Sequence, residues 1–181
     1  KEIHEQPRAV KDTLNSVLKD GKIDLTDIGL AEEDIRRTSQ IYIVACGSAY
    51  HVGMVAQYVI EDLVKIPVRV ELASEFRYRK PILDPNGLVI IISQSGETAD
   101  SLAALRETKA QGIRTLGIVN VVGSSIAREA DKVFYTLAGP EISVATTKAY
   151  STQLMASYIL AIQFAKVKNT ITEEQYENYI A

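Results

Sequence analysis

The sequence predicts a three-layer α/β/α protein with a parallel sheet as its middle layer. Two observations lead to this fold class. From residue 41 onward, short apolar runs alternate with segments of helical pattern, as in folds built from strand–helix units. The runs are also continuously apolar, which is typical of parallel strands covered by helices on both faces.

The chain begins with a polar, charged segment, 1–40, which we expect to be a helical lead-in. Its apolar residues Val10, Leu14, Val17 and Leu18 recur at helical spacing, and the pattern ends at Gly21. The segment could pack on the domain, or it could be a linker from an upstream part of a longer protein. Because the first residue is not Met, we expect the chain to be part of a longer protein.

Five apolar runs are the expected strands, and five helical segments separate or follow them. The strands are expected at 41–45, 68–70, 88–92, 115–119 and 132–136, and the helices at 49–64, 73–78, 99–110, 124–130 and about 147–167. We therefore place the domain at 41–168. In the remainder, 169–181, Thr172 and Gln175 have capping-box spacing, and we expect a helix that begins a connection to a further domain.

Composition and charge narrow the classes of partner. The 181 residues suffice for one domain with a core. The net charge is −3 and Lys and Arg form no run, so we expect binding neither to nucleic acid nor to an anionic membrane. No stretch has the roughly 18–20 apolar residues of a membrane span. With a single cysteine and no apolar signal region, we expect a cytoplasmic protein.

The strongest candidate binding site is the turn after the third expected strand, Ser93-Gln94-Ser95-Gly96-Glu97-Thr98. A helix is expected to begin near Thr98, where the first N–H groups have no intrahelical partner and the helix dipole is positive. Phosphate binds well at such an end. The hydroxyls and the Gln94 amide add neutral donors, and Gly96 lets the backbone approach a ligand closely.

Ordinary helix capping is the alternative explanation of this turn. Ser and Thr are frequent N-caps, and Glu97 fits a first-turn carboxylate better than a catalytic acid. Four hydrogen-bonding side chains within six residues, directly after a buried strand, favour a ligand about as strongly as capping. Both explanations stay open at this point.

Two other turns carry polar residues. After the first strand, Gly47 and Ser48 offer a backbone N–H and a hydroxyl, but they match neither a dinucleotide fingerprint nor a P-loop. Cys46 is expected to be a buried structural thiol, because no His or Asn pattern accompanies it. Before the last long helix, Thr146 or Thr147 is expected to cap the helix. Lys148 could face an anion or solvent, and solvent is the favoured expectation.

No metal site, cofactor or catalytic group is expected. His4 and His51 form no metal-ligand spacing with each other or with Cys46. No nucleophile elbow anchors a Ser/His/Asp arrangement either. From the residues alone, the chain is an anion-binding α/β domain without visible catalytic machinery.

Three segments carry a resemblance to a known family. They are 45–50 (Ala-Cys-Gly-Ser-Ala-Tyr), 73–79 (Ala-Ser-Glu-Phe-Arg-Tyr-Arg) and 93–100 (Ser-Gln-Ser-Gly-Glu-Thr-Ala-Asp). Together they resemble the SIS (sugar isomerase) domain family, and within it the first SIS domain of the glutamine-dependent aminotransferases that act on fructose 6-phosphate. The likeness extends over nearly the whole chain, and the last segment is fairly specific.

The resemblance implies a fold and a set of ligand contacts. It implies a five-stranded parallel sheet in the order 2-1-3-4-5, with the turns after strands 1 and 3 at one switch point. The residues it assigns to fructose 6-phosphate or glucosamine 6-phosphate are Gly47, Ser48, Ser93, Gln94, Ser95, Gly96, Thr98 and, at the sugar, Val144. Ala49 departs from the Ser of many members, so one hydroxyl contact is expected to be missing.

The resemblance also implies what lies outside this chain. The family enzyme has a glutaminase domain before the first SIS domain and a second SIS domain after it, and the catalytic groups are in those other parts. The chain is therefore expected to bind a phosphosugar without converting it, and to form a homodimer. The alternatives are a sugar-phosphate-sensing SIS domain of a transcriptional regulator and a purely structural dimerisation module.

Overall fold

A five-stranded parallel sheet forms the centre of the molecule. The computed structural model describes residues 1–181, and the strand order is β4-β3-β5-β6-β7, all parallel. The strands are β3 (Gln40–Ala45), β4 (Val68–Leu72), β5 (Gly87–Ser93), β6 (Arg114–Val119) and β7 (Lys132–Tyr135). In chain order this is 2-1-3-4-5, so the expected fold class and strand order are confirmed.

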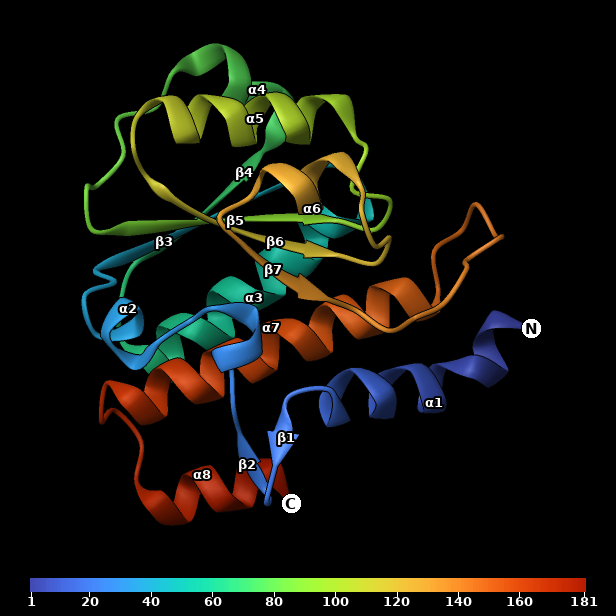
Figure 1. Ribbon diagram of the computed structural model, residues 1–181, viewed down its shortest axis with the longest axis vertical. Helices are drawn as coiled ribbons and strands as arrows, with labels where there is room; N and C mark the ends of the chain where they lie inside the picture. The colour runs from blue at the N-terminus through green and yellow to red at the C-terminus, as the bar shows by residue number, and fades with distance from the viewer.

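Helices cover both faces of the sheet, as Figure 1 shows. On one face lie α3 (Ser48–Val64) and α7 (Lys148–Val167), and on the other α4 (Ala73–Arg79), α5 (Ala99–Ala110) and α6 (Ser125–Glu129). Alternate residues of one strand enter different cores: Ile43 of β3 belongs to the cluster under α3 and α7, and its neighbour Val44 to the cluster under α4 and α5. This explains why the strands are continuously apolar.

The lead-in segment folds onto the α3/α7 face. Helix α1 (Glu2–Asn15) packs against α7, and η1 (Thr26–Ile28) and α2 (Glu32–Arg36) follow. Val17, Ile23 and Ile35 are buried in the larger core cluster. Of the two possibilities for this segment, packing on the domain is therefore realised, and a link to an upstream domain stays a prediction.

The helical expectation for the end of this lead-in is wrong. Helix α1 ends at Asn15, and β1 (Leu18–Lys19) pairs antiparallel with β2 (Lys22–Ile23). The turn between them is Asp20-Gly21, with φ of 52° and 73°. An Asp-Gly pair with two positive φ angles is a strong two-residue hairpin signal. The segment therefore forms a hairpin, although the spacing of Val17 and Leu18 also fits a helix.

The last helix, α8 (Glu173–Ile180), closes the same side of the molecule. Its capping box is confirmed, because Thr172 accepts from the N–H of Gln175 and the Gln175 side chain accepts from the N–H of Thr172. The Tyr176 hydroxyl accepts from the N–H of Ile23 at 2.8 Å, which ties α8 to the hairpin.

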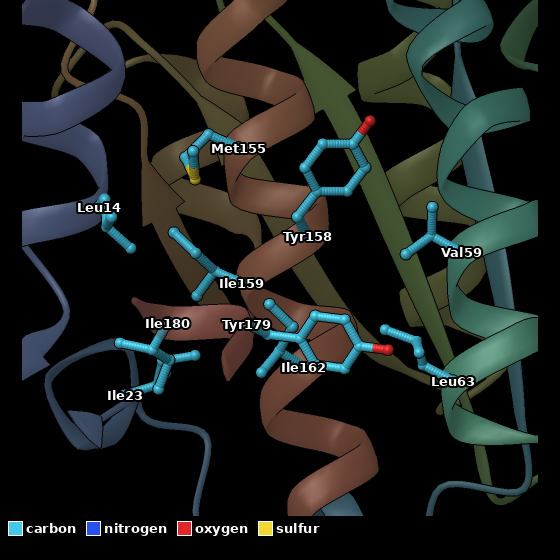
Figure 2. A pocket seen from close by; sticks show the side chains of 10 residues that line it. All are labelled: Leu14, Ile23, Val59, Leu63, Met155, Tyr158, Ile159, Ile162, Tyr179 and Ile180. Atoms are coloured by element: carbon cyan, nitrogen blue, oxygen red, sulfur yellow. The ribbon is translucent and has the colours of Figure 1, made fainter. Parts of the chain in front are cut away.

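An apolar groove lies between α8, α7, α3 and the lead-in (Figure 2). Its volume is about 290 Å³, and Leu14, Val59, Ile159 and Ile180 are among its lining residues. Tyr158 and Tyr179 supply the only side-chain hydroxyls there. The groove therefore offers an anion two hydroxyl donors and no charged or amide side chain. None of the helices has both the length and the apolar character needed to cross a membrane.

Candidate phosphosugar site

The candidate site lies where the sheet's connections diverge. Strands β3 and β5 are neighbours, with Ala45 opposite Ile92 at their carboxyl ends. The chain leaves β3 into α3 on one face and leaves β5 into α5 on the other (Figure 1). A crevice opens at such a switch point, and it is where open α/β sheets bind ligands.

A pocket of about 300 Å³ occupies this crevice. The predicted site residues that line it are Gly47, Ser48, Ser93, Gln94, Ser95 and Thr98. Cys46, Ala49, Ile92 and Gln153 complete the wall. The two turns thus converge as expected. No charged side chain lines the pocket, so an anion bound here would rely on neutral donors.

The hydroxyls of the second turn bond to the turn itself. Ser93 is 4% exposed; its Oγ accepts from the N–H of Gly96 at 3.1 Å and lies 3.0 Å from Oγ1 of Thr98. The Oγ of Ser95 accepts from the N–H of Glu97 at 3.2 Å. Thr98 occupies the N-cap position of α5, but its side chain makes no capping hydrogen bond. Capping therefore does not explain the Thr98 hydroxyl.

The two helices that start at the pocket have uncapped N-termini. Neither Gly47 before α3 nor Thr98 before α5 provides a side-chain cap. At the start of α6, by contrast, a carboxylate takes this role: Glu97 accepts from the N–H of Ser125 at 2.7 Å. Two positive helix ends with free N–H groups therefore face one small polar pocket.

A second carboxylate caps α7. Glu141 accepts from the N–H of Thr147 at 2.5 Å, from the N–H of Ala149 at 3.1 Å and from the hydroxyl of Thr146 at 3.1 Å. The expectation that Thr146 or Thr147 caps this helix is therefore wrong, since the Thr147 side chain makes no capping bond. A carboxylate is the stronger acceptor for N–H groups at a positive helix end.

Glu97 has a structural role, as expected of a first-turn carboxylate, although the helix it serves is α6 and not α5. Hydrogen bonds from the Ser125 side chain and backbone hold the pKa of Glu97 below its ordinary value. The group therefore stays ionised near neutral pH and is unsuited to act as a general acid.

Gly96 is required by a neighbour that the sequence did not reveal. Its φ is +67°, and a Cβ at this position would lie 2.0 Å from the Oγ of Ser124 at the start of α6. The N–H of Ile126 also donates to the carbonyl of Gly96 at 3.0 Å. Gly96 itself does not line the pocket, so a ligand contact from its backbone stays a prediction.

Three other residues, Val144, Lys148 and Cys46, either lie away from the pocket or differ in burial from what the sequence predicts. Val144 is fully exposed on the loop before α7 and does not line the pocket. Lys148 was expected to face solvent, which is wrong: it is 3% exposed and its ammonium group pairs with Glu5. Only the packing of α1 on α7 brings Glu5 next to Lys148.

Cys46 is half-buried at the pocket wall instead of fully buried, with the Ser101 hydroxyl 3.9 Å from its sulfur.

Sequence reasoning missed Gln153. It lies in the second turn of α7, is 4% exposed and lines the pocket. It is 55 residues or more from both turns in sequence, and nothing in its local pattern separates it from the other residues of a long helix.

Comparison with known proteins agrees with this architecture. The family model described as "SIS domain" matches residues 34–163. The chain belongs to the SIS domain family. The glutamine–fructose-6-phosphate aminotransferase (isomerising) of Clostridium tetani is 58% identical over 178 residues, which is 98% of this SIS chain and 29% of that protein.

Solved structures extend the likeness. The C-terminal domain of glucosamine-fructose-6-phosphate aminotransferase from Francisella tularensis superposes with a TM-score of 0.95 at 47% identity, covering 99% of this chain and 51% of that one. The sugar isomerase domain of an RpiR transcription factor from Sphaerobacter thermophilus has a TM-score of 0.69 at 21% identity, covering 98% and 92%. That second likeness concerns the fold alone, so the regulator alternative is the weaker one.

Proposed function

We propose that this chain is the phosphosugar-binding SIS domain of a glutamine–fructose-6-phosphate aminotransferase, also called glucosamine-6-phosphate synthase. The observation that carries the proposal is the neutral, donor-rich pocket between the uncapped N-termini of α3 and α5. It suits the phosphoryl group of fructose 6-phosphate or glucosamine 6-phosphate.

The proposed contacts come from both turns. Ser93, Ser95 and Thr98 present hydroxyls, Gln94 presents an amide, and the first N–H groups of α5 point the same way. From the other side, Gly47 and Ser48 contribute the start of α3. Since hydrogen bonds to a charged group are about twice as strong as neutral ones, several such donors can hold a phosphate without a cation. Val144 is proposed to reach the sugar.

The rest of the activity is proposed to lie in other parts of a longer protein. The chain spans about 29% of the length of the curated relative it matches. No residue here is assigned a catalytic role, and the chain is expected to bind without turnover. A homodimer, a cytoplasmic location, and a glutaminase domain and second SIS domain in the same protein belong to this proposal.

Calorimetric titration tests the proposal. Fructose 6-phosphate and glucosamine 6-phosphate should bind to the 181-residue chain, inorganic phosphate should bind more weakly, and neutral fructose should not bind measurably. Equal affinity for fructose and fructose 6-phosphate would overturn the proposal, because the pocket would then not recognise phosphate.

A further inference from the structure

Gln153 is the one pocket residue that comes from neither turn. It belongs to α7, which packs against α3 under one face of the sheet. Its side chain is 4% exposed and forms part of the pocket wall together with Ser48 and Ser93. A long polar side chain is thus held at the wall of a polar crevice by the largely buried helix α7.

The amide of Gln153 has no partner within the protein, unlike its polar neighbours on α7. Thr152 donates to the carbonyl of Ala149 at 3.0 Å, and Ser157 donates to the carbonyl of Gln153 at 2.9 Å. These hydroxyls are satisfied by their own helix. The Gln153 amide makes no such bond, although its residue is as deeply buried as theirs.

This unpaired amide faces the pocket. The only side-chain polar atom that is fully enclosed and unpaired in the molecule is the Oγ of Ser124. The amide atoms of Gln153 are therefore not sealed in the core, and the space they reach is the pocket that the residue lines. Leaving a largely buried amide unpaired is costly, and a ligand that accepts its hydrogen bond would remove that cost.

The chemistry of the pocket indicates which ligand group this is. The wall has no Lys or Arg, and Lys148, the cation nearest in sequence, is buried against Glu5. A phosphoryl group in such a site must be held by N–H and O–H donors alone. An amide NH2 supplies two N–H donors without bringing a counter-charge.

We propose that the Nε2 group of Gln153 donates a hydrogen bond to a phosphoryl oxygen of the bound phosphosugar. This inference rests on the proposed function and adds a specificity-determining residue from α7 to a site otherwise built from two strand–helix turns. Gln153 thereby binds the ligand from a third segment of the chain.

The side-chain amide resonance of Gln153 tests this in the unaltered protein. In ¹H–¹⁵N spectra, its NH2 signals should shift on addition of fructose 6-phosphate and also of inorganic phosphate, but not of fructose. If the backbone signals of the Ser93–Thr98 turn move and the Gln153 NH2 signals do not, the inference is overturned while the proposed function stands. If no signal at the pocket moves, both fail.

Two substitutions of similar size add a test by affinity. Gln153→Met removes the donor and should weaken fructose 6-phosphate binding about tenfold or more. Gln153→Glu places a carboxylate beside the phosphate and should weaken it further. Gln163→Glu is the matched control, ten residues along the same helix and so about 15 Å away, and should bind like wild type.

Thermal unfolding of each variant separates binding from folding. If Gln153 had only a structural role, each variant would lose affinity in proportion to its loss of Tm. The less stable of the Met and Glu variants would then also bind more weakly. Unchanged affinity in folded Gln153→Glu would overturn the inference. Should either variant fail to fold, the NH2 shift in the unaltered protein still decides.

Discussion

The hydroxyl oxygens of Ser93 and Thr98 lie 3.0 Å apart and close the turn between β5 and α5. Ser93 also accepts from the N–H of Gly96 inside this turn. Hydrogen bonds within the turn therefore hold it in one conformation, and the Thr98 hydroxyl lies at the pocket instead of capping α5. Preorganisation of this kind lowers the entropic cost of binding.

Thr98→Ala separates binding from capping. We expect the affinity for fructose 6-phosphate to fall about tenfold, since a donor to a charged group is lost. The free energy of unfolding should change by less than about 1 kcal/mol, because no capping bond is lost. Calorimetry and denaturant unfolding measure the two quantities.

The matched control is Thr172→Ala, which removes a real cap from α8. It should cost about 1 kcal/mol of stability and leave the affinity unchanged. If Thr98→Ala instead lost stability and kept its affinity, as this control should, the turn would be a structural cap. That result would favour the alternative of a purely structural dimerisation module.

Gly96→Ala should destabilise the protein by about 2 kcal/mol or more. A left-handed φ is unfavourable for Ala by about 1–2 kcal/mol, and the new Cβ would collide with Ser124. Denaturant unfolding should show that Ser124→Gly restores the part due to the collision, since Ser124 Oγ makes no hydrogen bond. A double variant no more stable than Gly96→Ala would contradict this explanation.

Ala49→Ser should tighten phosphosugar binding. Ala49 lines the pocket in the first turn of α3 and is 7% exposed. A hydroxyl there would add a donor at a positive helix end, and we expect a gain of up to about tenfold in affinity. Titration of both proteins with fructose 6-phosphate measures it. Unchanged affinity at unchanged Tm would mean that this side chain does not reach the ligand.

Asp34 should make stability fall in acid. Partial burial raises its pKa, but the hydrogen bond and charge of Lys132, 3.1 Å away, outweigh this and hold the pKa below its ordinary value. Because the folded-state pKa is the lower one, the contribution is present above about pH 4 and is lost as the pH falls through the folded-state pKa.

Asp34→Asn should therefore lose about 1 kcal/mol at pH 7 and show a shallower decline in stability below pH 4. Urea unfolding between pH 2 and pH 7 measures this. Asp20→Asn, in the exposed hairpin turn, is the control and should keep the wild-type profile. Parallel profiles for Asp34→Asn and wild type would show that this carboxylate does not link folding to pH.

Much of the fold could be predicted from local patterns. Continuous apolar runs such as 88–92 report burial on both faces of β5, and this feature is visible in the sequence. The hairpin at Asp20-Gly21 was missed because Val17 and Leu18 also fit helical spacing, and two positive φ angles decided the outcome. When helical spacing and a turn signal occur in the same segment, periodicity alone does not tell which structure forms.

Of the residues at the candidate site, some can be predicted from the local sequence and others cannot. Ser93 and Thr98 belong to one short turn, so their chemistry is readable in sequence. Gln153 and Lys148 depend on contacts across the chain: α7 places Gln153 at a pocket made by other segments, and α1 places Glu5 over Lys148. Such tertiary contacts have no local signature.

Binding of phosphate between the N-termini of α3 and α5 is tested most directly by following the NMR chemical shifts of the backbone amides during titration with fructose 6-phosphate. We expect the largest backbone shifts at Ser48, Ser95, Gly96 and Thr98, saturating at millimolar ligand or below. Silence at these amides with millimolar ligand, or shifts centred instead on the apolar groove around Val59 and Tyr158, would contradict it.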